Sequence, residues 1–236
     1  SIKNAADGVR VDNSSVFIGN SIFENNNNGI NFKSGDGSVL INNLFIRNTN
    51  GTNTSAATED NGTGNIQNTQ IVNNIFRHND AFGLSLGGYR VNSRYNNIIS
   101  NYAISNGSVG FNFHWGDVAR GFANNLIENN VIYNNSSHGI LIPRDSNSIV
   151  KNLIINNNGG GIMISGTYIY EGLTINKNIL VWNKLLGIDL GSCNNSNVSY
   201  NSIINSGEGL GTYSSYGNDR YNFTSIDVGD SYISGK

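Results

Sequence analysis

The chain has 236 residues, a formal net charge of −2 at pH 7, and charged side chains at only 13% of its positions. This composition excludes a basic nucleic-acid-binding surface and an acidic disordered tail, and no apolar stretch approaches the roughly 18 residues that a membrane-spanning helix needs. Because Cys193 is the only cysteine, the chain forms no internal disulfide.

From the N-terminus onward, a short phrase centred on asparagine recurs eight times, with an apolar residue three positions before it and another two positions after it. Arg94 is the only exception to the apolar rule in these two columns. A basic unit of about 22 residues that repeats with insertions is typical of a solenoid. The asparagines are Asn20, Asn43, Asn74, Asn97, Asn130, Asn152, Asn178 and Asn201, at intervals of 23, 31, 23, 33, 22, 26 and 23 residues.

A second phrase, in which glycine is followed by apolar, any and apolar residues, lies between these asparagines. Alternation with a period of two is typical of a strand that has one face buried. Gly51–Thr54 fills the same place without apolar side chains, and Gly209–Thr212 is a decayed copy. The clear copies are Gly8–Val11, Gly29–Phe32, Gly83–Leu86, Gly110–Phe113, Gly139–Ile142, Gly161–Ile164 and Gly187–Leu190.

Three short strands per unit predict an all-β fold, a parallel β-helix solenoid of about eight coils whose equivalent strands pair about 4.8 Å apart along the axis. We expect each repeated asparagine to adopt the left-handed conformation at a sharp corner. Their stacked amides would form a ladder that satisfies buried polar groups. A second column, five residues later, marks the next corner: Asn25, Asn48, Asn79, Asn135, Asn157 and Asn183.

We interpret residues 1–236 as a single β-helix domain that ends in an irregular cap at 212–236. The open end of a β-helix needs a cover, because unpaired strand edges invite association. A coil is already running at Ala5, and no capping helix precedes it. We therefore expect the chain to be part of a longer protein that carries additional domains.

Function in a solenoid concentrates where coils exceed their minimum length. The segment between the glycine phrase and the next repeated asparagine has 10 or 11 residues in most coils, but 20 after Thr54, 17 after Phe113 and 14 after Ile164. On the other side of the phrase, coil three alone is long, with an insertion at Tyr102–Val109. These insertions predict a groove over the sheet formed by the glycine phrases.

The outward positions of that sheet would form the floor of the groove, and the inserted segments would form its walls. Aromatic, basic and acidic side chains gather there although charge is scarce elsewhere, and this combination suits a sugar chain. The expected floor is Asn31, Lys33, Ser85, Asn112, His114, Leu141, Met163 and Asp189. The expected substrate-binding residues are Tyr89, Arg90, Asn112, Trp115, Arg120 and Asp189.

The segment from residue 113 to 120 is the densest in such side chains. His114 and Asp117 fit the roles of acid and base, and Arg144 and Asp145 would add a cation and a second acid one coil later. Structural alternatives stay open. The tryptophan of this segment could instead pack on the solenoid with Asp117 and Arg120 paired in solvent, and residues 144–145 could form only a turn.

The remaining ionisable side chains of the groove give weaker signals. Glu59 and Asp60 are the next candidates for a catalytic role, and His78 and His138 are interpreted as ordinary wall residues. For Asp189 a solvated position is the competing interpretation. No spacing of histidine and carboxylate side chains matches a metal motif, so no cofactor is expected, and a Ca²⁺ ion would have no recognisable motif.

The asparagine ladder and the glycine phrases resemble the right-handed parallel β-helix proteins of the pectate-lyase-like superfamily, which implies a right-handed coil. More narrowly, residues 41–140 resemble the disaggregatase-related proteins of methanogenic archaea, through Asn73–Asn79 and Phe111–Gly116. That resemblance implies action on a chondroitin-like matrix of uronic acid and N-acetylgalactosamine. The calcium-binding aspartates of pectate lyases and the paired aspartates of polygalacturonases are not evident, so no catalytic residue is transferred.

These observations favour an extracellular or cell-surface enzyme that cleaves an acidic polysaccharide and disperses cell aggregates. As a glycoside hydrolase it would need two carboxylates roughly 5 to 9.5 Å apart. As a polysaccharide lyase it would need a base beside the uronate and an arginine to neutralise the carboxylate. The alternative is a non-catalytic surface or matrix protein that binds glycans. The polysaccharide is the one partner expected, without nucleic acid or a membrane span.

Overall fold

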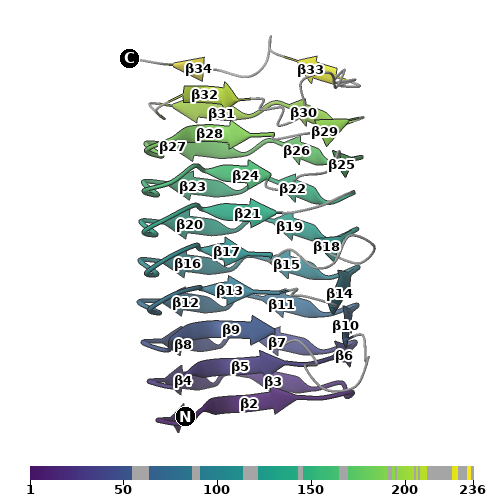
Figure 1. Cartoon of the computed structure of the whole chain (residues 1–236), viewed down its shortest axis with the longest axis vertical. Helices are drawn as coiled ribbons and strands as arrows, with labels where there is room; N and C mark the ends of the chain where they lie inside the picture. The colour runs from purple at the N-terminus through teal and green to yellow at the C-terminus, as the bar shows by residue number, and fades with distance from the viewer. Residues whose placement is uncertain are drawn as a thin grey trace.

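The computed structural model is a parallel β-solenoid, and its strands lie one above another from the N-terminus at one end to the C-terminus at the other (Figure 1). It describes residues 1–54, 64–86, 91–113, 122–142, 146–164, 170–190, 193–194, 196–204, 206, 208–211, 225–227 and 233–234. The predicted all-β solenoid is therefore confirmed.

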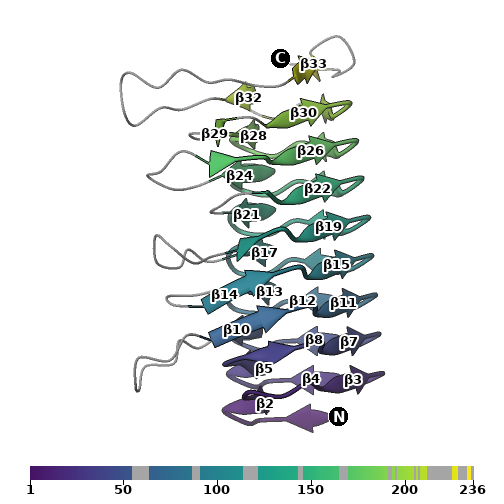
Figure 2. The same ribbon diagram turned by 90° about the vertical axis from the view of Figure 1, so that its right-hand side faces the viewer.

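Two long sheets run the length of the solenoid, and the nine-stranded sheet follows one side of it (Figure 2). Its strands are β3 (Phe17–Gly19), β7 (Val39–Ile41), β11 (Gln70–Val72), β15 (Asn97–Ile99), β19 (Leu126–Glu128), β22 (Ser148–Val150), β26 (Thr174–Asn176), β30 (Asn197–Ser199) and β33 (Ser225–Asp227). The ten-stranded sheet contains β1 (Ile2–Lys3), β4 (Ile22–Glu24), β8 (Leu44–Ile46), β12 (Ile75–Arg77), β16 (Tyr102–Ile104), β20 (Val131–Tyr133), β23 (Leu153–Ile155), β27 (Ile179–Val181), β31 (Ser202–Ile204) and β34 (Ile233–Ser234).

The glycine phrases form the third surface, which we call the glycine sheet. It contains β2 (Asp7–Val11), β5 (Asn28–Phe32), β9 (Asn50–Thr54), β13 (Leu84–Ser85), β17 (Phe111–Asn112), β21 (Ile140–Ile142), β24 (Ile162–Ile164), β28 (Leu186–Asp189) and β32 (Glu208–Gly211). Its first three strands join the other six through the backbone N–H of Gly51, which donates to the carbonyl of Phe82 at 2.9 Å. The doubtful copy at 51–54 is thus a genuine strand, β9.

Several coils contain a fourth short strand, so the prediction of three strands per coil is incomplete. The extra residues between the glycine sheet and the nine-stranded sheet pair with their equivalents on neighbouring coils. These strands are β6 (Gly35–Asp36), β10 (Gly64–Gln67), β14 (Val91–Arg94) and β18 (Phe122–Ala123), and separately β25 (Tyr170–Glu171) and β29 (Cys193–Asn194). In the segment expected to be an irregular cap, β33 and β34 continue the two long sheets.

The core is a stack of like residues, because each strand lies in register on its equivalent in the coil below. Phe23, Phe45 and Phe76 stack with centroids 4.9 and 4.8 Å apart, which matches the spacing of paired strands. The next residue in this column is the small Ala103, and Phe111 instead packs edge-on against Phe76 at 6.4 Å. All five side chains are fully buried.

The corner between the two long sheets consists of two residues with separate tasks. The first has a left-handed backbone, as at Asn42 (φ 56°), Asn129 (φ 55°) and Lys177 (φ 56°). The second carries the ladder: Oδ1 of Asn152 accepts the backbone N–H of Asn130 at 3.0 Å and its Nδ2–H at 2.9 Å. The prediction that one asparagine performs both tasks is wrong, because the turn conformation is confined to the residue before the ladder.

The ladder at this corner also corrects two predicted positions. Asn20 is the left-handed residue (φ 51°) before the ladder member Ser21, and Asn97 is the first residue of β15. Arg94, three positions before Asn97, broke the apolar pattern because Asn97 is not the ladder residue of this coil. The ladder residue is Asn101, and the residue three positions before it, Ile98, is buried. The observed ladder is Ser21, Asn43, Asn74, Asn101, Asn130, Asn152, Asn178 and Asn201.

Two further ladders hold the other corners. The second column begins at Asn26, because Asn25 is the left-handed residue (φ 55°), and it includes Asn106, which the prediction omitted. A third ladder, not anticipated, runs from Thr69 along the corner before the nine-stranded sheet. The second ladder is Asn26, Asn48, Asn79, Asn106, Asn135, Asn157 and Asn183, and the third is Thr69, Asn96, Asn125 and Asn147.

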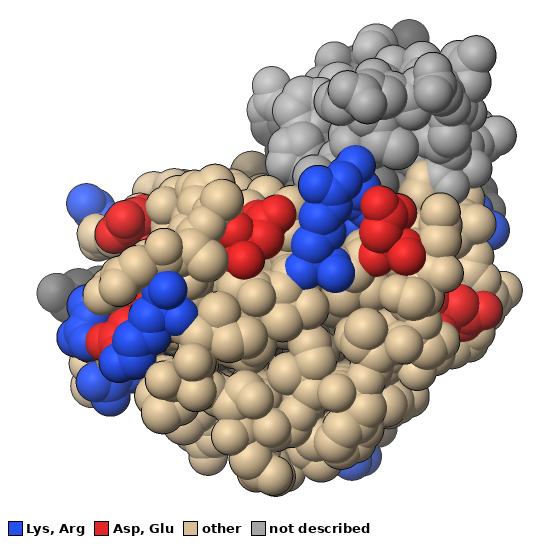
Figure 3. All heavy atoms as spheres, turned by 90° about the horizontal axis from the view of Figure 1, so that it is seen from below, with Lys and Arg blue, Asp and Glu red and all other residues tan. Residues whose placement is uncertain are grey.

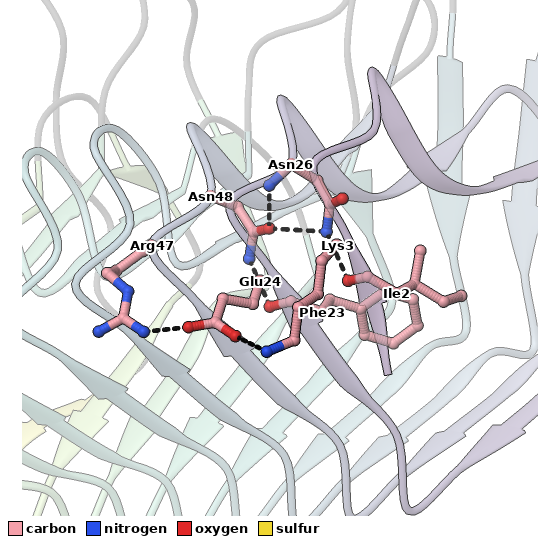
Figure 4. A network of polar contacts seen from close by, with 7 residues as sticks. All are labelled: Ile2, Lys3, Phe23, Glu24, Asn26, Arg47 and Asn48. Carbon is pink, nitrogen blue, oxygen red and sulfur yellow. Dashed lines mark hydrogen bonds and ion pairs between the residues drawn. The ribbon is translucent and has the colours of Figure 1, made fainter.

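The N-terminal end shows how ladders and ion pairs combine (Figure 4). Nδ2 of Asn26 donates to the carbonyl of Ile2 at 3.1 Å and to Oδ1 of Asn48 at 3.1 Å. Beside this ladder, Glu24 lies between Lys3 and Arg47, whose hydrogen bonds hold its pKa below the ordinary value. Seen from this end, charged groups are few on a largely uncharged surface (Figure 3).

Candidate functional site

The outer face of the glycine sheet carries one column of outward residues, in register from strand to strand. Three polar side chains of this column are nearly buried, since Asn31 is 8% exposed and Ser85 and Asn112 are 2% exposed, whereas Arg10 is exposed. The column contains Arg10, Asn31, Asn53, Ser85, Asn112, Leu141, Met163, Asp189 and Gly211. Every described residue that was predicted as floor, except Lys33, therefore lies in one line.

A second column on the same face consists of the residues just before the repeated glycines. At Asp7 the two columns meet, because its carboxylate accepts hydrogen bonds from Nδ2 of Asn28 at 2.8 Å and from Nδ2 of Asn31 at 3.0 Å. Nδ2 of Asn50 donates in turn to Oδ1 of Asn28 at 3.0 Å. The N-terminal half of this face is thus a network of amides around one carboxylate.

The repeated glycine places this second column outward. A Cβ atom on Gly139 would lie 2.5 Å from Cγ2 of Ile154 and 2.7 Å from the carbonyl oxygen of Gly161. The chain can pass this close to the core only without a side chain. The preceding residue, His138, therefore lies two positions before β21, at the edge of the outer face.

His138 is held against the next coil. Its Nδ1 accepts the backbone N–H of Gly160 at 2.8 Å, and a Cβ atom on Gly159 would lie 2.7 Å from that nitrogen. Burial lowers the pKa of His138 from its ordinary value, and the carboxylate of Asp189 opposes the shift. His138 was predicted to be an ordinary wall residue. The run Gly159–Gly161, one coil later, is the feature of the sequence that indicates space for its ring.

Asn112 is the other unusual residue of this face. Its Nδ2 is buried and has no hydrogen-bond partner. Buried amide groups are nearly always paired, so an orphaned donor needs an explanation. Ser85, its neighbour in register, has its backbone N–H satisfied by Oγ1 of Thr52 at 3.1 Å. Asn112 is therefore a buried donor on the floor whose hydrogen bond no group of the structure supplies.

Because Asn101, and not Asn97, belongs to the ladder, all the inserted segments lie at one edge of the glycine sheet. Measured to Asn101, the segment that follows Leu86 has 15 residues, so four coils, not three, are long between the glycine sheet and the next ladder member. The predicted insertion at 102–109 is wrong, since Tyr102 begins β16 and is 45% exposed on the ten-stranded sheet. All the long segments therefore leave the glycine sheet at the same edge.

Most of the predicted reactive side chains lie outside the described residues. The structure places Asn112 and Asp189 in one column, separated by Leu141 and Met163. The predicted catalytic residues His114, Asp117, Arg144 and Asp145 lie outside, as do the predicted binding residues Tyr89, Arg90, Trp115 and Arg120 and the reserve candidates Glu59 and Asp60.

The described part of the chain contains no group of three or more histidine, cysteine, aspartate or glutamate side chains able to hold a metal ion. In the same part, no helix is long and apolar enough to cross a lipid bilayer.

These features define a β-helix protein: its parallel sheets are stacked, three ladders hold its corners, and one column of side chains marks a candidate site on the outer face of the glycine sheet. A family profile described as "Right handed beta helix region" matches residues 61–225. This match spans more than half of the chain, so the protein belongs to the right-handed β-helix family. Its handedness agrees with the expectation drawn from the sequence resemblance. No curated protein matches the sequence.

Two kinds of solved structure resemble the fold. The A-module of the mannuronan C-5 epimerase AlgE4 of Azotobacter vinelandii is 16% identical, with a TM-score of 0.60 over 92% of this chain and 59% of that one. The periplasmic alginate epimerase AlgG is 14% identical, with a TM-score of 0.54 over 80% of this chain and 48% of that one. At such identities the likeness shows the fold alone. The chain spans about half the length of these proteins.

Proposed function

We propose that the protein is an extracellular or cell-surface enzyme that acts on a uronic-acid-containing polysaccharide bound across the outer face of the glycine sheet. The observation that carries this proposal is that polar side chains and long inserted segments occur together at this face. Its column contains the orphaned donor of Asn112 and the carboxylate of Asp189, and four long segments leave the sheet at one edge. Solenoids place their functional insertions on one such face.

The nature of the fold relatives supports the same class of substrate. Two solved β-helices of similar fold are named for alginate and mannuronan C-5 epimerisation. Epimerisation at C5 and lyase cleavage both begin with removal of the proton beside the uronate carboxylate, which requires a base and a group that stabilises the carboxylate. Within this class we favour cleavage of a chondroitin-like cell matrix, as in the disaggregatase-related proteins.

Purified protein incubated with unsulfated chondroitin, polygalacturonate and alginate tests the reaction. A lyase gives a product with a new double bond that absorbs in the ultraviolet. A hydrolase gives reducing ends without that absorbance, and an epimerase incorporates solvent deuterium without shortening the chain. Binding of a polymer without any of these changes would instead identify the non-catalytic glycan-binding protein.

The residues are tested separately. We expect Asp117→Asn, His114→Ala and Asp145→Asn each to reduce turnover by about 100-fold or more, as removal of a general acid or base does. Glu128→Gln and His78→Ala are the acid-to-amide and histidine controls, since Glu128 ends β19 of the nine-stranded sheet and His78 is the left-handed residue that follows β12 of the ten-stranded sheet. Near-full activity in all three site variants would place the chemistry elsewhere, with Glu59, Asp60 and Asp189 as the next candidates.

A crystal soaked with a chondroitin-type oligosaccharide tests the position of the site. Under the proposal, sugar lies over coils three to six, in contact with Tyr89, Arg90, Asn112 and Trp115. Arg144 would be close enough to face the uronate carboxylate. Ligand density on either of the two long sheets would refute this placement.

A further inference from the structure

The outer face of the ten-stranded sheet carries an unusual number of apolar side chains. In each of its three-residue strands the middle residue is buried, as at Phe45 and Ile132, so the first and third residues point outward. From β4 to β27 the first residues form one column in register, and every one of them is apolar or aromatic. This column is Ile22, Leu44, Ile75, Tyr102, Val131, Leu153 and Ile179.

The third residues form a second outward column, which is charged at Glu24 and Arg77 and is otherwise apolar or aromatic. We call the two columns from β4 to β27 the apolar face. At one end it meets the ion pairs of Glu24 with Lys3 and Arg47 (Figure 4). At the other end the first column continues with a polar residue, Ser202.

The size of this face marks it as a binding surface. Seven strands about 4.8 Å apart, with two columns about 7 Å apart, give an area of roughly 30 by 12 Å, or about 400 Å², which is the size of the apolar patches that mark binding sites on soluble proteins. On the nine-stranded sheet the outward residues instead include Gln70, Asn97 and Thr174. Five side chains of the apolar face are 38–46% exposed: Ile22, Ile75, Tyr102, Tyr133 and Ile179.

The order of side chains along the first column favours a second copy of this chain as the partner. One coil on either side of Tyr102 lie Ile75 and Val131. Two coils away are two leucines, at 44 and 153, and three coils away are two isoleucines, at 22 and 179. Side chains of nearly equal size thus lie at equal distances from β16. A two-fold dimer requires a self-complementary surface of this kind.

The second column agrees with the same axis. Arg77 and Tyr133 lie one coil on either side of Ile104, and beyond them lie Ile46 and Ile155. A two-fold axis along β16 would place the guanidinium group of Arg77 against Tyr133 of the other copy, and a cation is attracted to an aromatic ring face. Arg77 forms no ion pair with any described residue, so its charge is available for this contact.

The corners on either side of the apolar face would supply a polar rim. In these coils the left-handed corner residues are polar, as at Asn42, Arg47 and Asn134, with Trp182 as the exception. An apolar centre within a polar rim is the usual anatomy of a protein interface. With both corners included, the footprint is about 700 Å², close to the roughly 800 Å² that each partner buries in a stable complex. Every residue of this face and of its corners is described by the structure.

We propose that two copies of this chain associate through the apolar face, with antiparallel solenoids, a two-fold axis along β16, and the two sheets packed about 10 Å apart. The glycine sheet forms a different side of the solenoid and remains open in both copies. The inference therefore goes beyond the proposed function and does not depend on it.

Analytical ultracentrifugation over a range of concentrations tests the association. We expect the wild type to dimerise. Tyr102→Glu should weaken the dimer about 30-fold or more, because two carboxylates would meet on the axis in place of two packed rings. Tyr102 is exposed in the single chain, so circular dichroism should show a folded variant. Phe17→Glu, on the nine-stranded sheet, is the control and should dimerise as the wild type does.

Cross-linking tests the arrangement. In a Cys193→Ser background, the variants Ile22→Cys and Ile179→Cys are mixed and treated with a bis-maleimide reagent about 10 Å long. The mixture should cross-link, because the axis brings these two positions together on different copies. Each variant alone should not, since its two copies of the cysteine would be about 29 Å apart. Efficient cross-linking of Ile22→Cys alone would mean parallel solenoids and would overturn the proposed arrangement.

Two further results would overturn the dimer itself. One is a wild type that stays monomeric up to about 0.1 mM, because a stable interface of this size is populated well below that concentration. The other is a monomer that binds phosphatidylcholine vesicles and loses this binding in Tyr102→Glu, which would assign the apolar face to a lipid surface.

Discussion

Nδ1 of His138 accepts a hydrogen bond from the backbone N–H of Gly160, 22 positions later in the sequence, at 2.8 Å. This bond joins a side chain at the edge of the outer face to the backbone of the next coil. It fixes the ring only because Gly159 and Gly160 have no side chains to displace it. The orientation of this outer-face residue is thus set by its neighbouring coil.

Protonation of His138 should destabilise the fold at acid pH. Its pKa in the folded protein is lowered, so the unfolded chain binds the proton more readily. Its contribution is therefore fully present above the ordinary histidine pKa and is lost as the pH falls through the lower folded value. We expect urea midpoints from neutral pH to about pH 5 to fall less steeply in His138→Gln than in the wild type. His78→Gln should follow the wild type, and parallel curves for all three proteins would contradict the prediction.

Gly159→Ala should displace the imidazole without unfolding the solenoid. Its Cβ atom would lie 2.7 Å from Nδ1 of His138, and 2.9 Å from both the backbone nitrogen of that residue and the carbonyl carbon of Ser137. The ring and this part of the backbone must therefore shift, and the ring loses its bond to Gly160. The labelled-histidine NMR spectrum should then show mixed tautomers. In Gly19→Ala, where the nearest atoms are side-chain carbons at 3.2 and 3.3 Å, the His138 signal should remain as in the wild type.

Asn112→Leu should weaken substrate binding without lowering the stability of the fold. Because Nδ2 of Asn112 is buried without a partner, leucine should leave the thermal midpoint unchanged or raise it, and leucine already occupies the next position of the column, at 141. Chondroitin binding should weaken about 3- to 10-fold. Asn53→Leu, on the same column in β9 but outside coils three to six, should bind normally. A lowered midpoint in Asn112→Leu would mean that the amide is satisfied.

Asn130→Leu should cost about 1–3 kcal/mol of unfolding free energy, because its amide accepts from Asn101 and donates to Asn152 and to the carbonyl of Ile98, all in the core. The adjacent Asn129→Lys should be nearly neutral, since lysine occupies the equivalent left-handed position at 151 and 177. Chemical denaturation of the two variants measures both effects. Equal costs would show that the two corner residues do not divide their tasks.

The sequence determined the repeat, the sheets and the existence of ladders. Each coil stacks on its own equivalents, so the burial of Ile127 and the pairing of Asn130 depend on residues that carry the same pattern one unit away. A local period of two and a repeated amide are therefore sufficient to predict a solenoid. The line of floor residues from Asn31 to Asp189 followed from the same alternation.

Only the tertiary structure decided which asparagine occupies the ladder where several compete. In coil three Asn96, Asn97 and Asn101 are near one another in sequence, and the choice followed from burying Ile98 in the core. Because of that choice, the long segment of coil three follows the glycine sheet instead of preceding it.

The surroundings of His138 could likewise not be predicted from the sequence. His138, Gly160 and Asp189 come from three successive coils, and their proximity arises from the register between strands. Residue spacing along the chain does not specify that register when insertions vary from coil to coil. The pattern of a solenoid is local and can be read from the sequence, whereas the chemistry of its face depends on which coil packs beside which.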